Sequence, residues 1–432
     1  MRGVGKGAEG AGTIADVRKI HHRGSWSNPE GRPAGSVPAA SAHLTSADGT
    51  DRMLLYLTLG TILLIVGAEG LVRGAAALAA RMRVPPLLVG LTVVALGTSS
   101  PEVLVTVRAA LGGHPGLAVG NVVGSNLFNV LFILGLAALI GTLRVTAPVI
   151  RRDVPLLIAA SLLTLGFVLD GSLGRGEGLV LLSLAVVYTL HLAGAGIRAS
   201  QTARYDDRAM DRKEGRDPLR SSVPSGSPGV PVSILLVAGG AGGLVWGASW
   251  VVTGATELAA VFGVPEPIVG LTVLAAGTSL PEIATSVNAA LRGRGDLAVG
   301  SIVGSNLYNL FLVLGVGAVL SPVSLEVAES LIRFDVPLML GAAIALLPFA
   351  ATGHRIDRWE GGVFLFYWLA YLALLVLEVL GHPVRESMWV LFAAFLVPIT
   401  LVTLGVVGMR VIRGEEDPEA DEHEEGTHDE VG

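Results

Sequence analysis

The sequence predicts an all-α polytopic membrane protein, built from two inverted-topology repeats of five helices each and extended by an eleventh helix near the C-terminus. Three observations predict this fold class. Of the 432 residues, 51% are hydrophobic and 15% are charged, whereas soluble proteins carry about 25% charged residues. Uncharged runs of about 20 residues separate the clusters of charge, which is the length that a membrane helix requires. Finally, a long segment of the first half recurs in the second half.

Hydrophobic segments divide the chain into elements and connections. We predict membrane helices over 53–80, 86–111, 117–141, 154–170, 178–198, 231–261, 267–291, 297–320, 335–351, 361–380 and 388–409. Residues 1–52 are polar and lack periodicity, so we expect a disordered N-terminal extension. We expect a first repeat at 53–198, a cytoplasmic linker loop at 199–230, a second repeat at 231–380, the additional helix at 388–409 and an acidic cytoplasmic tail at 410–432.

Arginine residues mark one side of the membrane. They gather in alternate connections between the predicted helices, at 81–83, 144–152, 198–220, 292–294, 355–358 and 410–413. Positive charge is enriched in cytoplasmic loops. We therefore expect a multi-pass protein of the cell membrane with its N-terminus outside and its acidic tail in the cytoplasm.

The two halves repeat each other at a fixed offset of 180 residues. The segment 90–129 aligns with 270–309, and 25 of these 40 positions are identical. Because each half holds an odd number of predicted helices, the second half has to enter the membrane in the opposite orientation. Inverted repeats with interrupted helices are typical of secondary transporters, in which the ion site lies near the midplane between the repeats.

The first repeated motif, "GTSSPE" at 97–102 and "GTSLPE" at 277–282, places a proline and a glutamate within an apolar segment. Proline removes a helical hydrogen bond and frees carbonyl groups of the preceding turn. Within a bilayer such carbonyls need a protein group or a bound ion. An intramembrane glutamate costs about 2.5 kcal/mol or more by insertion scales, so two of them in duplicate motifs predict a functional site. Ala95, Ser99 and Glu102 lie on one helix face.

The second repeated motif is "GSNLFN" at 124–129 and "GSNLYN" at 304–309. Ser125 and Asn129 are four residues apart, as are Ser305 and Asn309, so each pair shares a helix face. Asn126 and Asn306 point elsewhere, and we expect them to serve packing or hydrogen bonding. The pairs of glycines at 120 and 124, and at 300 and 304, indicate close helix contacts.

The side chains of both motifs offer only oxygen ligands, and the chain has no cysteine. Oxygen donors favour hard cations such as Ca²⁺ and Na⁺ over Zn²⁺ or Cu²⁺. Two facing carboxylates cannot both remain ionised without a counter-charge. One divalent cation, several monovalent cations or protons can each neutralise them, and this competition is a physical basis for ion exchange.

These paired motifs resemble the repeats of the cation/calcium exchanger superfamily, most closely its prokaryotic sodium/calcium exchanger branch, over residues 53–380. The resemblance implies a ten-helix exchanger core and Ca²⁺ and Na⁺ as transported ions, within the lipid bilayer and without cofactors, catalytic residues or nucleic acid. It also implies that the first helix of each half slides during alternating access. The ligands that it implies are Glu102 and Glu282, with Thr98, Ser99, Ser125, Asn129, Thr278, Ser279, Ser305, Asn309 and the carbonyl groups near Ala95 and Ala275.

Alternative functions remain open at this point. A Ca²⁺/H⁺ exchanger would keep the glutamate pair, but the hydroxyl and amide set favours Na⁺. Some relatives carry aspartate at the position of Asn309, which is associated with K⁺ dependence in one branch, so asparagine here favours a K⁺-independent exchanger. A cation channel is a further alternative. An intramembrane protease is disfavoured, because Asp296 of the "GRGD" segment lies in a short basic connection and no H-E-x-x-H motif is present.

Overall fold

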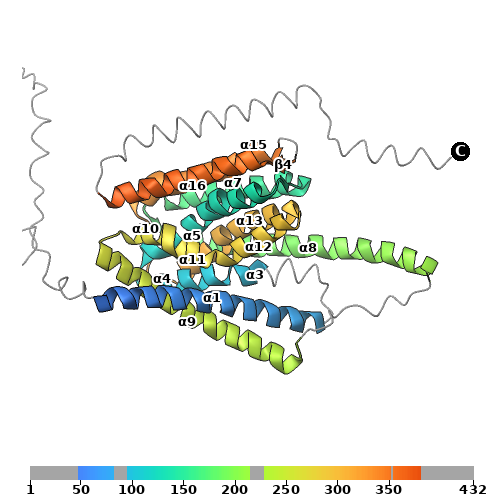
Figure 1. Cartoon of the computed structure of the whole chain (residues 1–432), viewed down its shortest axis with the longest axis horizontal. Coiled ribbons are helices and arrows are strands. Elements are labelled where there is room, and N and C mark those ends of the chain that lie inside the picture. Colours follow the sequence, from blue (N-terminus) through green and yellow to red (C-terminus); the bar gives the residue numbers. More distant parts are fainter. Residues whose placement is uncertain (1–46, 82–94, 215–227, 352–353, 381–432) are drawn as a thin grey trace, which may run out of the picture. The chain divides into compact units, whose positions relative to one another are not determined.

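The computed structural model describes residues 47–81, 95–214, 228–351 and 354–380, all within the compact unit that begins at Ala47 (Figure 1). The first half contains α1 (Ala47–Arg81), α3 (Ala95–Thr98), α4 (Ser100–Leu111), α5 (Pro115–Leu127), the π-helical η4 (Phe128–Leu134), α6 (Gly135–Ile140), β1 (Leu143–Arg144), η5 (Val149–Asp153), α7 (Val154–Val168), β2 (Ser172–Leu173) and α8 (Arg175–Glu214).

The second half repeats this order of elements. It contains α9 (Val230–Phe262), α10 (Glu266–Val269), η6 (Gly270–Leu274), α11 (Ala275–Thr278), α12 (Leu280–Leu291), α13 (Gly295–Tyr308), η7 (Asn309–Val313), α14 (Leu314–Leu320), β3 (Leu325–Glu326), η8 (Leu331–Asp335), α15 (Val336–Ala351), β4 (Arg355–Ile356) and α16 (Arg358–Val379).

Among the described residues, six helices are long and apolar enough to cross a membrane, and a seventh is obtained if the bent pair Glu266–Thr278 and Leu280–Leu291 counts as one span. The expected spans at 86–111, 154–170 and 335–351 coincide with shorter helices, α4, α7 and α15, of 12, 15 and 16 residues. The expected helix at 388–409 and the tail at 410–432 lie outside the described residues, as does most of the N-terminal extension.

Two expected boundaries are wrong. Helix α1 begins at Ala47 rather than at Met53, so the last residues of the expected extension are helical. Helix α8 continues to Glu214, so residues 199–214 form a helix instead of the start of a linker loop. The segment is polar, but its arginine, alanine, methionine, lysine and glutamate residues all have high helix propensity.

Among the described elements, the most extensive packing contact joins α1 to α9, which lie side by side in blue and yellow-green in Figure 1. Glycine allows their backbones to approach. A Cβ atom built at Gly240 would lie 2.5 Å from the backbone nitrogen of Leu71 and 2.6 Å from the carbonyl oxygen of Gly67. Gly67 is equally confined, since its Cβ would lie 2.9 Å from the carbonyl oxygen of Gly240. The two helices therefore touch backbone to backbone.

Short antiparallel strands connect the two halves at two places. Strand β1, after α6, pairs with β4, after α15, with Leu143 opposite Ile356. Strand β2, after α7, pairs with β3, after α14, with Leu173 opposite Leu325. All four of these apolar side chains are buried. Each pair thus joins a connection of one half to a non-equivalent connection of the other.

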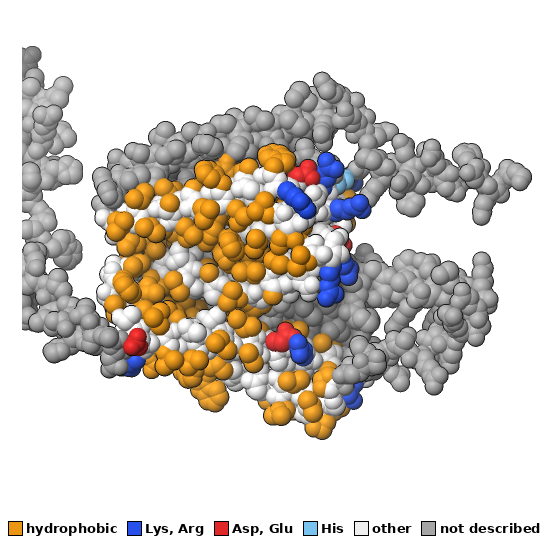
Figure 2. Space-filling view, in the orientation of Figure 1, with side chains coloured by type: hydrophobic (Ala, Val, Ile, Leu, Met, Phe, Trp, Pro, Cys, Tyr) orange, Lys and Arg blue, Asp and Glu red, His pale blue; other side chains and the backbone are white. Residues whose placement is uncertain are grey.

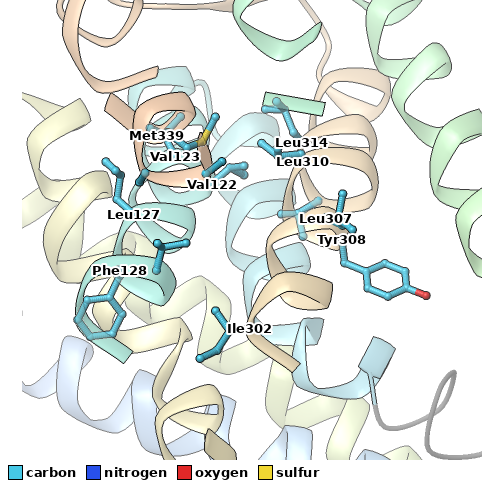
Figure 3. Close-up of a cluster of buried hydrophobic side chains, with 14 of the residues drawn as sticks. Val122, Val123, Leu127, Phe128, Ile302, Leu307, Tyr308, Leu310, Leu314 and Met339 are labelled. Carbon is cyan, nitrogen blue, oxygen red and sulfur yellow. The ribbon is translucent and has the colours of Figure 1, made fainter. Parts of the chain in front are cut away.

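The interior is built mainly by α5 and η4 in the first half and by α13 and η7 in the second half. Side chains from α5 and η4, such as Val122 and Phe128, gather in one apolar cluster with Ile302 and Leu307 of α13 (Figure 3). Figure 2 shows that apolar side chains also cover much of the visible surface, while lysine and arginine gather toward one end. Leu235, 70% exposed, is an example of this outer apolar surface. Such a surface is suited to lipid rather than to water.

The glycine contact between α1 and α9 can be tested with Gly240→Ala. Alanine gains helix propensity, but its Cβ has to displace the α1 backbone, and overpacking of this kind costs about 1–3 kcal/mol. We expect a lower melting temperature of the purified protein in detergent. Gly239→Ala is the matched control, because its Cβ meets nothing within 4 Å. Equal melting temperatures of the two variants would contradict the proposed role of the contact.

Candidate cation site

The two glutamates lie in the interior, each in the first turn of a helix that follows a break. Ser99 separates α3 from α4 with φ −79° and ψ 1°, and Ser279 separates α11 from α12 with φ −86° and ψ 13°. The helices around the second break are bent by 52°. Proline at the start of α4 and α12 fits the break, because the first turn of a helix does not use its backbone N–H groups. Glu102 and Glu282 are 1% and 2% exposed.

Hydroxyl groups of the second half bind the carboxylate of the first. Ser279 Oγ donates a hydrogen bond of 3.2 Å to Glu102 Oε1, and the hydroxyl of the preceding residue, Thr278, lies close to the same carboxylate. The two carboxylates are also close enough for their charges to interact. The site of Glu102 is therefore completed by residues about 180 positions away in the sequence.

The reverse arrangement holds for Glu282. Thr98 of the first half donates a hydrogen bond to its carboxylate. Ser305 Oγ, from its own half, donates to Glu282 Oε1 over 3.4 Å. The expected residues Thr98, Ser279 and Ser305 therefore meet the glutamates as hydroxyl donors, and neither half contains the site alone.

Several buried oxygen atoms of the expected ligand residues have no hydrogen-bond partner within the described part of the chain. They are Ser99 Oγ, Glu102 Oε2, Ser125 Oγ, Asn129 Oδ1, Glu282 Oε2 and Asn309 Oδ1. A buried polar group without a partner costs about 1–3 kcal/mol. Bound cations would satisfy these atoms. These six atoms belong to predicted ligands, whereas three further buried atoms without a partner, Asn126 Oδ1, Ser286 Oγ and Tyr367 Oη, do not. Carboxylate, hydroxyl and amide oxygens are the ligands that hard cations prefer.

The two predicted backbone ligands have different surroundings. The carbonyl oxygen of Ala275 accepts hydrogen bonds from the backbone nitrogen of Ser279 over 3.1 Å and from Thr278 Oγ1 over 3.4 Å. The backbone bond from Ser279 thus occupies one lone pair of this carbonyl, and the single Thr278 hydroxyl hydrogen is shared between it and Asn121 Oδ1. Ala95 is the first residue of α3, at the edge of the described residues, and its role as a ligand stays a prediction.

Both asparagines of the expected ligand set lie in π-helical segments. Asn129 belongs to η4 and Asn309 is the first residue of η7. The expected i, i+4 alignment with Ser125 and Ser305 assumed regular α-helix. Both pairs are nevertheless buried. π-Helical turns occur frequently at functional sites, because they alter the direction of the side chains that follow.

Asn121 also belongs to the polar network of the site, although comparison of the two halves does not identify it. Its amide donates a hydrogen bond of 3.0 Å to Thr106 Oγ1, and its Oδ1 accepts one of 3.4 Å from Thr278. It therefore connects α4 and α5 to the break before α12. The repeat places Ser301 at the equivalent position, so no duplicated motif marks this residue. A buried asparagine in an apolar helix was the available signal.

Residues 52–194 and 232–377 match the family model described as "Sodium/calcium exchanger protein". The two matched ranges cover most of both halves and include every residue discussed above as a possible ligand. Both contain one copy of each repeated motif.

Individual proteins are similar over most of the chain. The putative antiporter CaxA of Alkalimonas amylolytica is 36% identical over 74% of this chain and 98% of its own length. The sodium/calcium exchanger MaX1 of Methanosarcina acetivorans is 31% identical over 74% of this chain and 97% of its own. A solved structure of the sodium-calcium exchanger NCX_Mj, soaked with Na⁺ and Sr²⁺, has a TM-score of 0.51 and 28% identity, and the match covers 75% of this chain and 98% of that one.

Cation binding at the glutamates can be tested by thermal unfolding in detergent. A ligand that binds only the folded state adds about 2.7 kcal/mol at 100 times its Kd. We expect Ca²⁺ to raise the melting temperature of the wild type relative to chelator. Glu282→Gln, which removes the charge with little change in volume, should lose this shift.

The matched control is Glu329→Gln, because its side chain is 74% exposed and pairs with Arg333 at the surface. It should keep the full stabilisation by Ca²⁺. If Ca²⁺ raised the melting temperature of Glu282→Gln as much as that of the wild type, the assignment of the site would be contradicted.

Proposed function

Because the chain belongs to the sodium/calcium exchanger family, we propose that it exchanges Ca²⁺ for Na⁺ across the cell membrane at one buried site shared by its two halves. The observation that carries this proposal is the cross-bonded glutamate pair, in which Glu102 accepts from Ser279 and Glu282 accepts from Thr98. A site completed by both halves ties ion occupancy to their relative arrangement.

The charge of the site supports exchange rather than simple binding. Two carboxylates carry up to two negative charges, which one Ca²⁺ or several Na⁺ can neutralise. The ions then compete for the same oxygens and leave on alternate sides. We propose the ligand set Glu102, Glu282, Thr98, Ser99, Ser125, Asn129, Thr278, Ser279, Ser305 and Asn309, with the carbonyl groups of Ala95 and Ala275.

The strand pairings support the inverted ten-helix arrangement. Successive connections of a membrane protein alternate between the two sides. In the first half, β1 and β2 lie in successive connections. In the second half, β3 lies in the connection equivalent to that of β1, and β4 in the connection equivalent to that of β2. Since β1 pairs with β4 and β2 with β3, equivalent connections lie on opposite sides. The second half is therefore proposed to run through the membrane in the reverse direction, as in other transporters built from inverted repeats.

The arginine distribution supports an orientation with the N-terminus outside. Under this orientation β1 and β4 face the cytoplasm, and Arg144 lies opposite Arg355 in that pair. The other pair, with Ser172 opposite Glu326, faces the exterior and contains no positive charge at these positions. This difference agrees with the enrichment of positive charge in cytoplasmic loops.

Ion flux into proteoliposomes tests the proposal. We expect an outward Na⁺ gradient, without a pH gradient, to drive uptake of radioactive Ca²⁺ by the wild type. Glu102→Gln should lower this uptake by about 100-fold or more, because losing one member of a buried charge arrangement costs about 3–5 kcal/mol. Insertion of the variant is checked by its elution and melting profile in detergent.

Parallel gradients separate the alternatives. Uptake driven by a pH gradient alone would identify a Ca²⁺/H⁺ exchanger and contradict Na⁺ coupling. A requirement for K⁺ would contradict the interpretation of Asn309. Ca²⁺ flux that persists without any counter-ion gradient and greatly exceeds transporter rates would identify a channel.

A further inference from the structure

Asn306 connects the second copy of the GSN motif to the first. Its Oδ1 accepts a hydrogen bond of 2.9 Å from Asn129 Nδ2. Its own Nδ2 donates a bond of 3.2 Å to the backbone carbonyl of Asn126. The three side chains are each 1% exposed. Asn306 on α13 therefore holds both the side chain and the backbone of a short segment of the opposite half.

The hydrogen bond between Asn129 and Asn306 determines which end of the Asn129 amide is available to a ligand. A primary amide has an oxygen that can bind a cation and an NH₂ group that cannot. Because Nδ2 is bonded to Asn306, the opposite end, Oδ1, is the atom left buried without a partner. If the amide turned over, its NH₂ group would take the place of the unpartnered oxygen.

This arrangement is not duplicated by the repeat. Asn126 is the equivalent of Asn306, but its Nδ2 donates to the carbonyl of Val122 in its own helix over 2.9 Å. Its Oδ1 has no hydrogen-bond partner within the described residues, so it does not hold Asn309 as Asn306 holds Asn129. The two halves thus share a motif but use its middle asparagine differently.

We propose that Asn306 is a positioning residue, which fixes the Asn129 amide with its carbonyl oxygen toward the cation site. This inference rests on the proposed function, because it concerns a ligand of the same site. It assigns the orientation of one ligand to a side chain that contributes no ligand itself. Partners that orient metal ligands typically change metal affinity by about 10–100-fold when they are removed.

The first experiment measures the Ca²⁺ concentration for half-maximal uptake in the full-length protein. Asn306→Leu removes both hydrogen bonds with little change in volume, and we expect this concentration to rise about tenfold. Asn306→Ala is a second variant that removes both hydrogen bonds, whereas Asn306→Asp keeps the oxygen that accepts the hydrogen bond from Asn129. The aspartate variant should stay closer to wild type than either of them. Asn126→Ala is the matched control from the other half and should change affinity by less than about threefold, since its amide bonds only within its own helix.

A double-mutant cycle separates orientation from general packing. Asn129→Asp presents an oxygen from either end, so the orientation no longer matters. In that background we expect Asn306→Leu to change the half-maximal concentration by less than about twofold. An additive effect, with the full tenfold loss still present, would overturn the proposal, as would a wild-type affinity for Asn306→Leu. Failure of the proposed function is distinguishable, because it would appear as absent Na⁺-driven Ca²⁺ uptake in the wild type itself.

Discussion

The hydroxyl group of Ser279 reaches across the molecule to Glu102, and Thr98 reaches back to Glu282. Burying carboxylates in an apolar interior is costly unless polar partners surround them. Neither half supplies enough partners by itself. The glutamates therefore require the two halves to pack face to face. The rest of the architecture allows the halves to come this close.

Local irregularities of the backbone serve this approach. Breaks at Ser99 and Ser279 start new helices beside the carboxylates, and π-helical turns begin at Phe128 and Asn309 on the neighbouring helices. Gly120 and Gly124 let α5 approach the backbone of η6, since a Cβ at Gly124 would lie 2.5 Å from Leu271 Cα. These features interrupt regular helices in the segments that make polar contacts between the halves.

Much of this organisation could be predicted from the sequence because it is duplicated. The repeat marked the two glutamates and most of their polar neighbours, and the expectation that Asn306 serves hydrogen bonding is confirmed. Features that differ between the halves could not be found in this way. The bond from Asn129 to Asn306 has no equivalent in the other half, and the residue equivalent to Asn121 is a serine. A Cβ atom added at Gly300 or Gly304 would meet no atom within 4 Å, so the helix contacts expected there are absent, whereas those of Gly120 and Gly124 are present.

Other differences have local causes. The helix that extends to Glu214 is polar, so a search for apolar runs ends too early. The π-helical turns depend on packing between segments that are distant in the chain. They leave no periodicity that a single sequence reveals.

The strand pairs also impose an order on biogenesis. Strands β1 and β2 are synthesised well before β3 and β4, which are their partners. Ribosomes add about 5–20 residues per second, so the roughly 150–210 residues between partners correspond to about 8–40 seconds of synthesis. Throughout this interval the first half resides in the bilayer with open strand edges and with Glu102 lacking its partners. The first half thus completes its strand pairs and its bond to Glu102 only when its counterpart has been made.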